Sequence, residues 1–307
     1  MTNDTKSSAL RHVRILVNRK SGFMWSFDKV QAAFDDFWDT PENDLLYQFC
    51  KDAKDGRTKA RRAAAQGVDI LLVVGGDGTI STTGAALIDS STALGAIPMG
   101  SGNGFARHFG IALSPADAAL DLATAEIKAI DVGCVNDRPF LATCSMAWDA
   151  AIVRTFQKSP VRGIFPYIVA GVHEFFNYTP QPINIVIDNN ETLYIPDPLL
   201  FTVANLTQYG GDLKIASDAE PDDGCLELII ARKQDTPWLL GNVMNLTKSS
   251  LAELPKVVFR KFKHLRVERE KPDMIQIDGE LVEAPAVVEV TVKPHCLKVL
   301  VPRQLDV

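Results

Sequence analysis

The stretch ILLVVGGDGT, residues 70–79, decides the fold of this chain because an apolar run leads directly into a loop of glycines. The run from Ile70 to Val74, bounded by glycines, indicates a strand buried on both faces, and the residues after Thr79 favour a helix. Glycines let a ligand approach the main chain, and the first free N–H groups of a helix attract an anion. The stretch therefore predicts a phosphate-binding loop, with a plain tight turn in an α/β sheet as the alternative.

Asp77 stands in the middle of this loop and needs an explanation of its own. A carboxylate that faced a phosphate group directly would repel it. Its useful partner is a divalent cation, held directly or through water against the phosphate oxygens. We therefore expect Asp77 to organise such a cation.

The bulk composition limits the class of protein. The chain has 307 residues, enough for two domains with separate cores, and its 46% hydrophobic and 23% charged residues are typical of a soluble globular protein. The net charge of -6 argues against a nucleic-acid-binding protein, which would be basic overall. The polar start Met1–Ser8 lacks the build of a signal peptide, and no apolar run reaches roughly 18 residues, so we expect a cytoplasmic protein. The five cysteines are scattered without a C-x-x-C pair, which argues against disulfides or a zinc site.

The two halves of the sequence differ in the pattern of their apolar residues and therefore in their predicted secondary structure. In the first half, apolar runs alternate with helical stretches, which indicates a parallel sheet covered by helices. We predict strands at 13–17, 45–49, 70–74 and 93–97, and helices at 25–38, 58–66, 80–88 and from Ser114 onward. In the second half, antiparallel strands are predicted at 183–187, 199–203, 226–231 and 287–292, with helical insertions at 164–176 and 238–254. The expected domains are an α/β domain at 1–126 and a β-rich domain at 127–307.

A second glycine loop, Pro98–Arg107, follows the strand that ends at Ile97 and leads into a short helix. Two such loops at neighbouring strand ends would clasp one nucleotide. The glycines of this loop nearly match the G-x-G-x-x-G pattern of dinucleotide-binding Rossmann domains, but the third glycine comes one position early. The loop is therefore weak evidence for a Rossmann site. These glycines are Gly100, Gly102 and Gly104. Ser101 and Asn103 offer polar groups to a phosphate or a hydroxyl and Arg107 offers charge, while capping of the short helix is their alternative role.

Two clusters of carboxylates lie in the second half. In the run Gln276–Glu280, Asp278 and Glu280 would point to the same side of an extended chain. In such a pair, one carboxylate can accept a hydroxyl proton while the other holds a cation or water. The dipeptide D-G is also a strong hairpin signal, which is the alternative. The acidic run Asp218–Cys225 either aims its oxygens at Mg²⁺ or Ca²⁺ or forms a solvated surface loop.

Together these residues resemble the diacylglycerol kinase catalytic family, which includes bacterial soluble lipid kinases and the sphingosine and ceramide kinases. The loops Gly75–Thr79 and Pro98–Arg107 are similar to the two phosphate loops of the family, and Asn18-Arg19-Lys20-Ser21-Gly22 resembles its first strand-end motif with Arg19 in place of proline. The later motifs follow in the family's order: Ile130-Asp131-Val132-Gly133, Asn205, Tyr209-Gly210-Gly211, Asp218, Asp222-Asp223-Gly224 and Asp278-Gly279-Glu280. The ordered series, which runs over nearly the whole chain, is specific even though no single motif is.

The resemblance implies an NAD kinase-like α/β domain and a β-sandwich domain for the lipid substrate, whose last strand returns to the first domain, with ATP in the cleft between them. It implies that ATP is bound through Asn18, Ser21, Gly22, Gly75, Gly76, Asp77, Gly78, Thr79, Gly100, Ser101 and Asn103. Asp77 and Glu280 would organise Mg²⁺, and Asp278 or Glu280 would accept the proton of the lipid hydroxyl. Bacterial members also hold a structural Mg²⁺ through one aspartate and nearby carbonyls. Here these would be Asp223 and the backbone of Glu220 and Cys225.

The function expected on this basis is ATP-dependent phosphorylation of a diacylglycerol-like or sphingoid-like lipid, with transient contact at a membrane surface and 164–176 lining an acyl pocket. A basic stretch interleaved with apolar residues would approach the bilayer, unless it forms an ordinary strand with one solvated face. Its members are Lys256, Arg260, Lys261, Lys263, Arg266 and Arg269. Gly104 replaces an aspartate of many bacterial members, which leaves the lipid open. NAD kinase and a non-catalytic lipid- or nucleotide-binding regulator are the alternatives, and both a monomer and a dimer are compatible with the sequence.

Overall fold

The computed structural model describes residues 10–18, 27–148, 150, 178–210, 213–236 and 256–303. The predicted helices at 164–176 and 238–254, and the predicted ligand residues Ser21 and Gly22, lie outside these ranges. By its internal contacts the chain divides into two compact units. The first unit comprises Met1–Gly100, Phe109–Lys128 and Leu297–Val307, and the second comprises Ser101–His108 and Ala129–Cys296.

The first unit contains a parallel sheet. Its strands are β1 (Arg11–Asn18), β2 (Asn43–Cys50), β3 (Ile70–Gly75) and β4 (Ala93–Pro98), in the spatial order β2-β1-β3-β4. All four confirm the strands predicted for this half. On the other side of β4, Val299 near the end of β18 (Val287–Val301) pairs in parallel with Leu94. Every residue of β3 and β4 is buried, as expected of strands covered on both faces.

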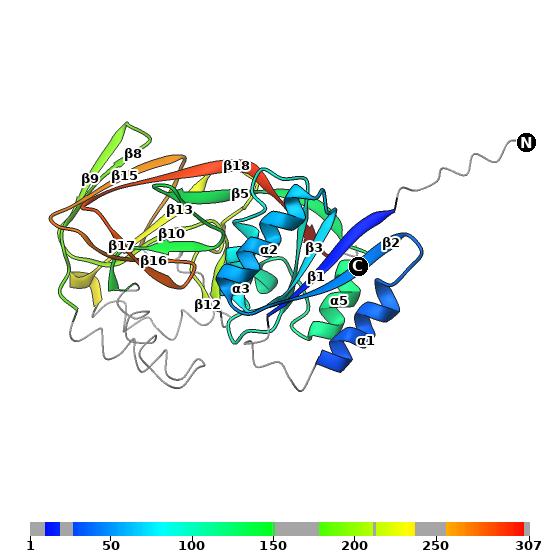
Figure 1. The fold of residues 1–307 in the computed structure, drawn as a ribbon. Coiled ribbons are helices and arrows are strands. Elements are labelled where there is room, and N and C mark those ends of the chain that lie inside the picture. Colours follow the sequence, from blue (N-terminus) through cyan, green and yellow to red (C-terminus); the bar gives the residue numbers. More distant parts are fainter. Residues whose placement is uncertain are drawn as a thin grey trace, which may run out of the picture. The chain divides into compact units, whose positions relative to one another are not determined.

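Four helices cover this sheet, namely α1 (Phe27–Phe37), α2 (Ala53–Ala65), α3 (Asp77–Gly84) and α5 (Pro115–Ala123). Helix α1 contacts α5 and α2 contacts α3, and Figure 1 shows the two pairs on opposite faces of the sheet. Helix α2 begins before the predicted position because the carboxylate of Asp52 accepts the N–H of Asp55 at 2.9 Å and caps the helix there. Helix α3 likewise begins early, at Asp77, because Gly76 is extended and acts as its N-cap.

The second unit contains two antiparallel sheets. One has the order β18-β15-β8-β9, with β15 (His264–Arg269), β8 (Ile183–Ile187) and β9 (Glu191–Ile195), while β5 (Glu126–Val135) pairs with β18 and with β6 (Arg138–Phe140). The other has the order β14-β13-β10-β7-β16-β17. Its strands are β14 (Val258–Phe262), β13 (Leu226–Arg232), β10 (Pro198–Ala204), β7 (Thr143–Ser145), β16 (Asp273–Ile277) and β17 (Glu280–Ala284). Short elements complete the unit: α4 (Gly104–His108), β11 (Gln208–Gly210), β12 (Leu213–Lys214) and the 3₁₀ turn η1 (Lys233–Asp235).

One buried cluster joins these two sheets. It includes Ile185, Val267 and Val290 from the first sheet and Phe201, Leu228 and Ile275 from the second. The sheets therefore pack face to face as a sandwich, because each must bury its apolar face. The predicted fold class, a parallel α/β domain followed by an antiparallel β-sandwich, is confirmed. Among the described residues, no helix is long and apolar enough to cross a membrane.

Candidate functional site

The predicted phosphate loop lies at a switch point of the parallel sheet. The chain passes from β1 outward to β2 and then returns across β1 to β3, so the connections on the two sides of the β1/β3 pair lead in opposite directions. In open α/β sheets, ligands bind at such a point, outside the carboxyl ends of the strands. The loop Gly75–Thr79 follows β3 there, and Asn18 ends β1 beside it. The Nδ2 group of Asn18 donates a hydrogen bond to Oγ1 of Thr79 at 2.7 Å.

Close contacts explain two of the glycines in this loop. A Cβ atom on Gly75 would lie 2.8 Å from the Cβ of Thr79, and one on Gly76 would lie 3.2 Å from the Cα of Gly100. At Gly78, by contrast, no atom of another described residue outside the helix backbone lies within 4 Å of the added Cβ position. As far as the described residues go, the space outside the first turn of α3 is therefore open, and the helix N-terminus has room for an anion. Asp77, the first residue of α3, is partly exposed at this end.

The second glycine loop meets the first through its opening residues. Strands β3 and β4 are neighbours with Gly75 opposite Pro98, and the N–H of Met99 donates to the carbonyl oxygen of Gly75 at 2.8 Å. Gly100 lies next to Gly76 as a result. The structure thus brings the two loops together at neighbouring strand ends as far as Gly100. The remainder of the second loop belongs to the second unit.

That remainder forms the beginning of α4. Asn103 is buried and has a φ of 52°, a left-handed conformation that asparagine tolerates. Its carbonyl oxygen accepts the N–H of Arg107 at 3.0 Å, and Nε of Arg107 donates to the carbonyl oxygen of Gly102 at 3.2 Å. These contacts stabilise the loop itself, in line with the capping role. Binding of a nucleotide by Ser101 and Asn103 stays a prediction.

His108, the last residue of α4, fastens this helix to the second unit. Its Nδ1 atom accepts the backbone N–H of Thr207 at 3.1 Å and lies 3.0 Å from Oγ1 of the same residue. Burial lowers the pKa of His108 to about 4, against the opposing effect of the Asp222 charge. The ring is therefore neutral at pH 7 and holds the second loop through an unprotonated nitrogen. Nothing local in the sequence distinguishes this histidine, because its partner lies 99 residues away.

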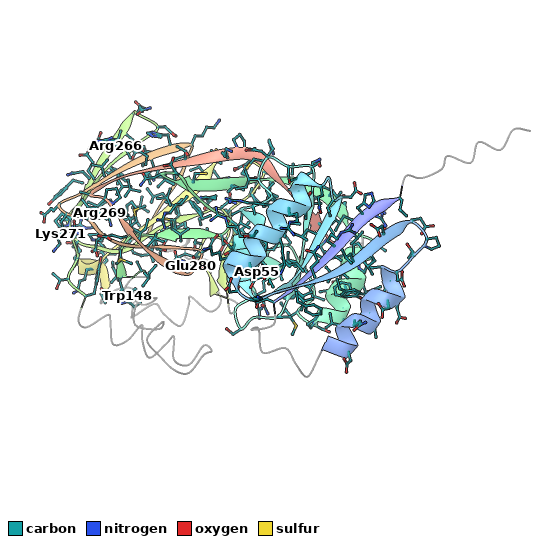
Figure 2. All side chains as sticks on the ribbon, in the orientation of Figure 1. Asp55, Trp148, Arg266, Arg269, Lys271 and Glu280 are labelled. Atoms are coloured by element: carbon teal, nitrogen blue, oxygen red, sulfur yellow. The ribbon has the colours of Figure 1, made fainter. Side chains whose placement is uncertain are left out.

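Asp278 and Glu280 occupy different positions in a β-hairpin. Strands β16 and β17 pair with Ile277 opposite Glu280, so Asp278 and Gly279 form the two-residue turn, with φ values of 46° and 83°. The expectation of an extended chain that points both carboxylates to one side is wrong. The hairpin alternative is confirmed, because D-G suits a turn in which both residues have positive φ. Glu280 is the exposed first residue of β17 (Figure 2).

The carboxylate of Asp278 is used as a structural anchor. Its Oδ2 atom accepts the N–H of Leu141 at 2.8 Å, and Oδ1 accepts the N–H groups of Ala142 at 2.8 Å and Thr143 at 3.0 Å. Three such bonds commit this carboxylate to holding the backbone of 141–143 in place. The side chain of Glu280, by contrast, makes no hydrogen bond or ion pair with any other residue that the structure describes.

Two residues from the motifs that resemble the kinase family, Asp131 and Asn205, hold the acidic loop 218–225 in place. Asp131 is fully buried, and its carboxylate accepts the N–H groups of Gly224 at 2.6 Å and His295 at 2.7 Å. Its own N–H donates to the carbonyl oxygen of Pro221 at 2.6 Å. Asn205 donates Nδ2 to the carbonyl oxygen of Asp131 at 2.9 Å. Both side chains therefore support the loop from within the unit.

Asp223, the predicted ligand of a structural Mg²⁺, already has a cationic side chain as a partner. Its Oδ1 atom accepts the N–H of Cys225 at 2.9 Å, and Oδ2 lies 2.6 Å from Nζ of Lys261. Each oxygen thus has one partner among the described residues, and one of these partners is a cation. Within the described part of the chain, no group of three or more histidine, cysteine, aspartate or glutamate side chains is placed to hold a metal ion. A site built from Asp223 and the backbone of Glu220 and Cys225 would not form such a group, and this assignment stays a prediction.

Lys261, on β14, is the cationic partner of this acidic loop, and the sequence did not predict that pairing. The hydrogen bond to Asp223 raises the pKa of Lys261, and the charges of Asp223, Glu227 and Glu220 act in the same direction. Burial raises the pKa of Glu227, which lies opposite Lys261 on β13, while the lysine charge opposes that change. One ammonium group thus faces several carboxylates.

The basic stretch predicted to approach a membrane is mostly paired with carboxylates. The pairs are Lys256–Asp235 (2.9 Å), Arg260–Glu191 (3.4 Å), Lys261–Asp223 (2.6 Å) and Arg266–Glu289 (2.7 Å). Arg269 is buried, and its Nη2 group donates to the carbonyl oxygens of Ala284 and Pro285 (Figure 2). The stretch forms β14 and β15, which agrees with the alternative of ordinary strands. Membrane contact through it stays a prediction.

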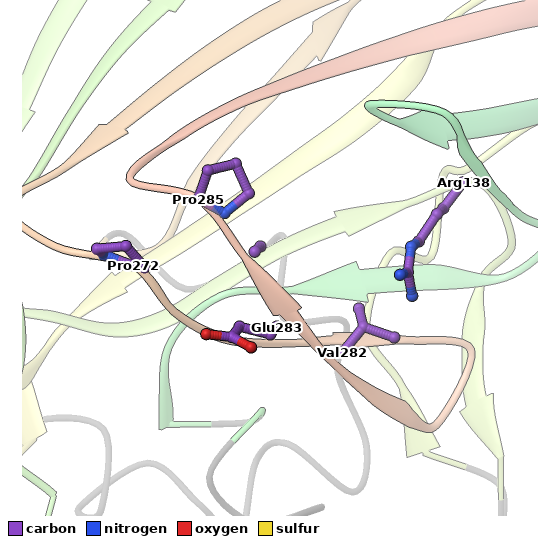
Figure 3. Close-up of a pocket in the computed structure, with 6 residues that line it drawn as sticks. Arg138, Pro272, Val282, Glu283 and Pro285 are labelled. Atoms are coloured by element: carbon purple, nitrogen blue, oxygen red, sulfur yellow. The ribbon is translucent and has the colours of Figure 1, made fainter.

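A pocket of about 660 Å³ lies at the open end of the β16–β17 hairpin (Figure 3). Its lining residues are Arg138, Pro272, Val282, Glu283, Ala284 and Pro285. At this end Asp273 pairs with Ala284, whereas the Asp278–Gly279 turn closes the other end. None of the predicted site residues lines this pocket.

Comparisons with known proteins extend over both units. Residues 12–135 match the family described as the diacylglycerol kinase catalytic domain, and residues 142–301 match the YegS C-terminal NAD kinase beta sandwich-like domain. A diacylglycerol kinase of Mycobacterium tuberculosis (strain CDC 1551 / Oshkosh) is 30% identical over 259 residues, which cover 82% of this chain and 83% of the relative. A diacylglycerol kinase of Staphylococcus saprophyticus is 28% identical over 236 residues, covering 74% and 75% of the two chains.

Solved structures share the fold. A crystal structure of a diacylglycerol kinase from Bacillus anthracis str. Sterne superposes with a TM-score of 0.71 at 20% identity and covers 95% of this chain and 97% of its own. Another crystal structure from that organism reaches a TM-score of 0.80 at 21% identity and covers 96% and 99%. At these identities the likeness shows the architecture, including its NAD kinase-like β-sandwich.

Proposed function

The chain belongs to the diacylglycerol kinase catalytic domain family, and from this premise we propose that it is an ATP-dependent lipid kinase that transfers the γ-phosphoryl group to a lipid hydroxyl. The observation that carries the proposal is the loop Gly75–Thr79 at the switch point of the parallel sheet, where the described residues leave the space at Gly78 open. The substrate is a diacylglycerol-like or sphingoid-like lipid. A cytoplasmic location with transient contact at a membrane surface belongs to the same proposal.

ATP and Mg²⁺ are the cofactors of this proposal. When bound, Mg²⁺ neutralises charge on the β- and γ-phosphate oxygens. The residues present suit this group, because Asp77 stands at the open N-terminus of α3 and supplies a carboxylate to a cation next to phosphate. Asn18 positions the hydroxyl of Thr79 at the same loop, and the glycines allow close approach of the phosphates. Asp77 thus holds the cation, and the loop binds and orients the nucleotide.

Glu280 is the proton acceptor in this proposal, in preference to Asp278. The lipid oxygen forms its bond to the γ-phosphorus as the bond from that phosphorus to the β,γ-bridging oxygen breaks, and the hydroxyl proton passes to a carboxylate. Glu280 is exposed and unpaired among the described residues, whereas the oxygens of Asp278 already accept three N–H groups. A positioned base of this kind contributes a factor of about 10² to 10⁴ in rate.

The test is incubation of the purified chain with labelled ATP, Mg²⁺ and a total lipid extract, followed by identification of the labelled product. We expect a phosphorylated lipid, and Glu280→Gln should lower kcat by about 10² to 10⁴ with an unchanged Tm. Glu283→Gln is the matched control, since Glu283 is an exposed glutamate of the same strand. Full activity of Glu280→Gln removes the proposed base. Formation of labelled NADP when NAD is added to the incubation would instead favour an NAD kinase, and binding of ATP without transfer to any acceptor would favour a non-catalytic regulator.

A further inference from the structure

The acidic loop 218–225 carries several negative charges, and hydrogen bonds hold its backbone in place. Its carboxylates are Asp218, Glu220, Asp222 and Asp223, and Glu227 follows on β13 with a relative exposure of 7%. The buried carboxylate of Asp131 fixes Gly224, and its N–H fixes Pro221, each at 2.6 Å. Carboxylates gathered on a fixed backbone repel one another unless a cation lies among them.

Lys261 supplies a cation at this place. It lies on β14 directly opposite Glu227, and side chains at opposed positions of neighbouring strands project from the same face. Its Nζ atom reaches Oδ2 of Asp223 at 2.6 Å, a short charge-assisted hydrogen bond. The other oxygen of Asp223 accepts the N–H of Cys225, so both acceptor atoms of this carboxylate are engaged. A Mg²⁺ ion bound to this carboxylate, with oxygens at about 2.0–2.1 Å, would compete with the ammonium group for the same negative charge.

From this geometry we infer that Lys261 is the permanent counter-cation of the acidic loop, in the place where a structural Mg²⁺ is predicted, and that the second unit folds without a divalent ion. Together with the proposed kinase function, this means that the Mg²⁺ bound with the nucleotide is the one metal that the reaction requires. Only this last step rests on the proposed function. The arrangement depends on a single side chain of the chain itself. It is therefore open to a direct mutational test.

The experiment measures the Tm of the purified full chain in EDTA and in excess MgCl₂, without lipid or ATP. We expect the wild type to show the same Tm in both solutions. Lys261→Met should lower the Tm in EDTA by about 2–4 °C, and Mg²⁺ should raise the Tm of this variant alone. Lys261→Arg keeps a cation and should stay close to the wild type. Lys263→Met is the matched control, because Lys263 is an exposed lysine two positions along that forms no ion pair within the described residues.

Two results would overturn the inference. One is a fall in the wild-type Tm on addition of EDTA, which would mean that a divalent ion stabilises the fold. The other is a Lys261→Met variant with the same Tm as Lys263→Met. Because these readings need no catalysis, an inactive but stable wild type would contradict the proposed function and leave the role of Lys261 intact.

Discussion

Replacement of Asp278 by asparagine separates a structural carboxylate from a catalytic one. Asparagine fits the turn, since it tolerates the φ of 46° and Asn-Gly is favoured in hairpins of this type. It keeps one acceptor oxygen, which we expect to face the N–H groups of Ala142 and Thr143. The N–H of Leu141 then meets an amide NH₂ group instead of an oxygen. The substitution therefore changes the hydrogen bonds of the carboxylate and little else.

The magnitude follows from those three bonds. A hydrogen bond to a charged group is worth about 1.5–3 kcal/mol and one between neutral groups about 0.5–1.5 kcal/mol. The variant loses the bond to Leu141, at 2.8 Å in the wild type, and weakens the bonds to Ala142 and Thr143 by roughly 1 kcal/mol each. We therefore expect the free energy of unfolding to fall by about 3–5 kcal/mol.

The assay is urea unfolding of the purified chain, combined with hydrogen exchange of the amides of 141–143. In Asp278→Asn, exchange at these amides should become faster, whereas Glu280→Gln should change neither exchange nor stability. The refuting result is specific. If Asp278→Asn loses less than about 1 kcal/mol of stability while its kcat falls as far as that of Glu280→Gln, then Asp278 takes part in the chemistry and the anchoring argument fails.

Three further predictions concern the glycine loops and His108. Gly76→Ala places a methyl group 3.2 Å from the backbone of Gly100, so its Tm should fall and its KM for ATP should rise by about tenfold, as measured by thermal unfolding and initial rates. Gly78→Ala adds a methyl group that lies more than 4 Å from the other described residues outside its own helix, so it should keep its Tm. It should nevertheless lose affinity for ATP in calorimetry, because the methyl group enters the space proposed for phosphate; unchanged ATP binding would contradict this. For His108, whose pKa falls from 6.5 to about 4 on folding, only the unfolded chain gains the proton as the pH drops from 6.5 toward 4. Stability should therefore decline on the order of 2–3 kcal/mol over this interval in urea unfolding, and His108→Gln should remove that slope.

Local pattern predicted the elements better than their ends. Strands such as β3 and β4 were found because strands buried on both faces are apolar throughout, and that property is local. The helix starts were displaced because caps decide them. At α2 the deciding group is Asp52, and at α3 it is the extended backbone of Gly76.

Some residues of the candidate site were likewise predictable from their neighbours in the sequence, and others were not. The glycine loop after β3 was predicted from adjacent residues alone, since a strand, a glycine turn and a helix start follow one another in the chain. For the two carboxylates of the hairpin, the sequence leaves open which one accepts the proton. In the structure, Asp278 is anchored to the backbone of 141–143, which precedes it by 135 to 137 positions in the chain, and Glu280 is exposed. No local pattern contains that difference.

The sequence alone predicts a phosphate loop at the end of a buried strand, followed by a β-rich half that carries clustered acids. The contacts of those acids are visible in the folded chain and not in any local pattern. Asp278 faces three backbone N–H groups, and Asp223 faces Lys261, which lies 38 residues further along the chain. The reason is physical: the backbone conformation of a loop follows from its own residues, whereas the charge of a side chain is balanced by whichever groups the fold brings within a few ångströms.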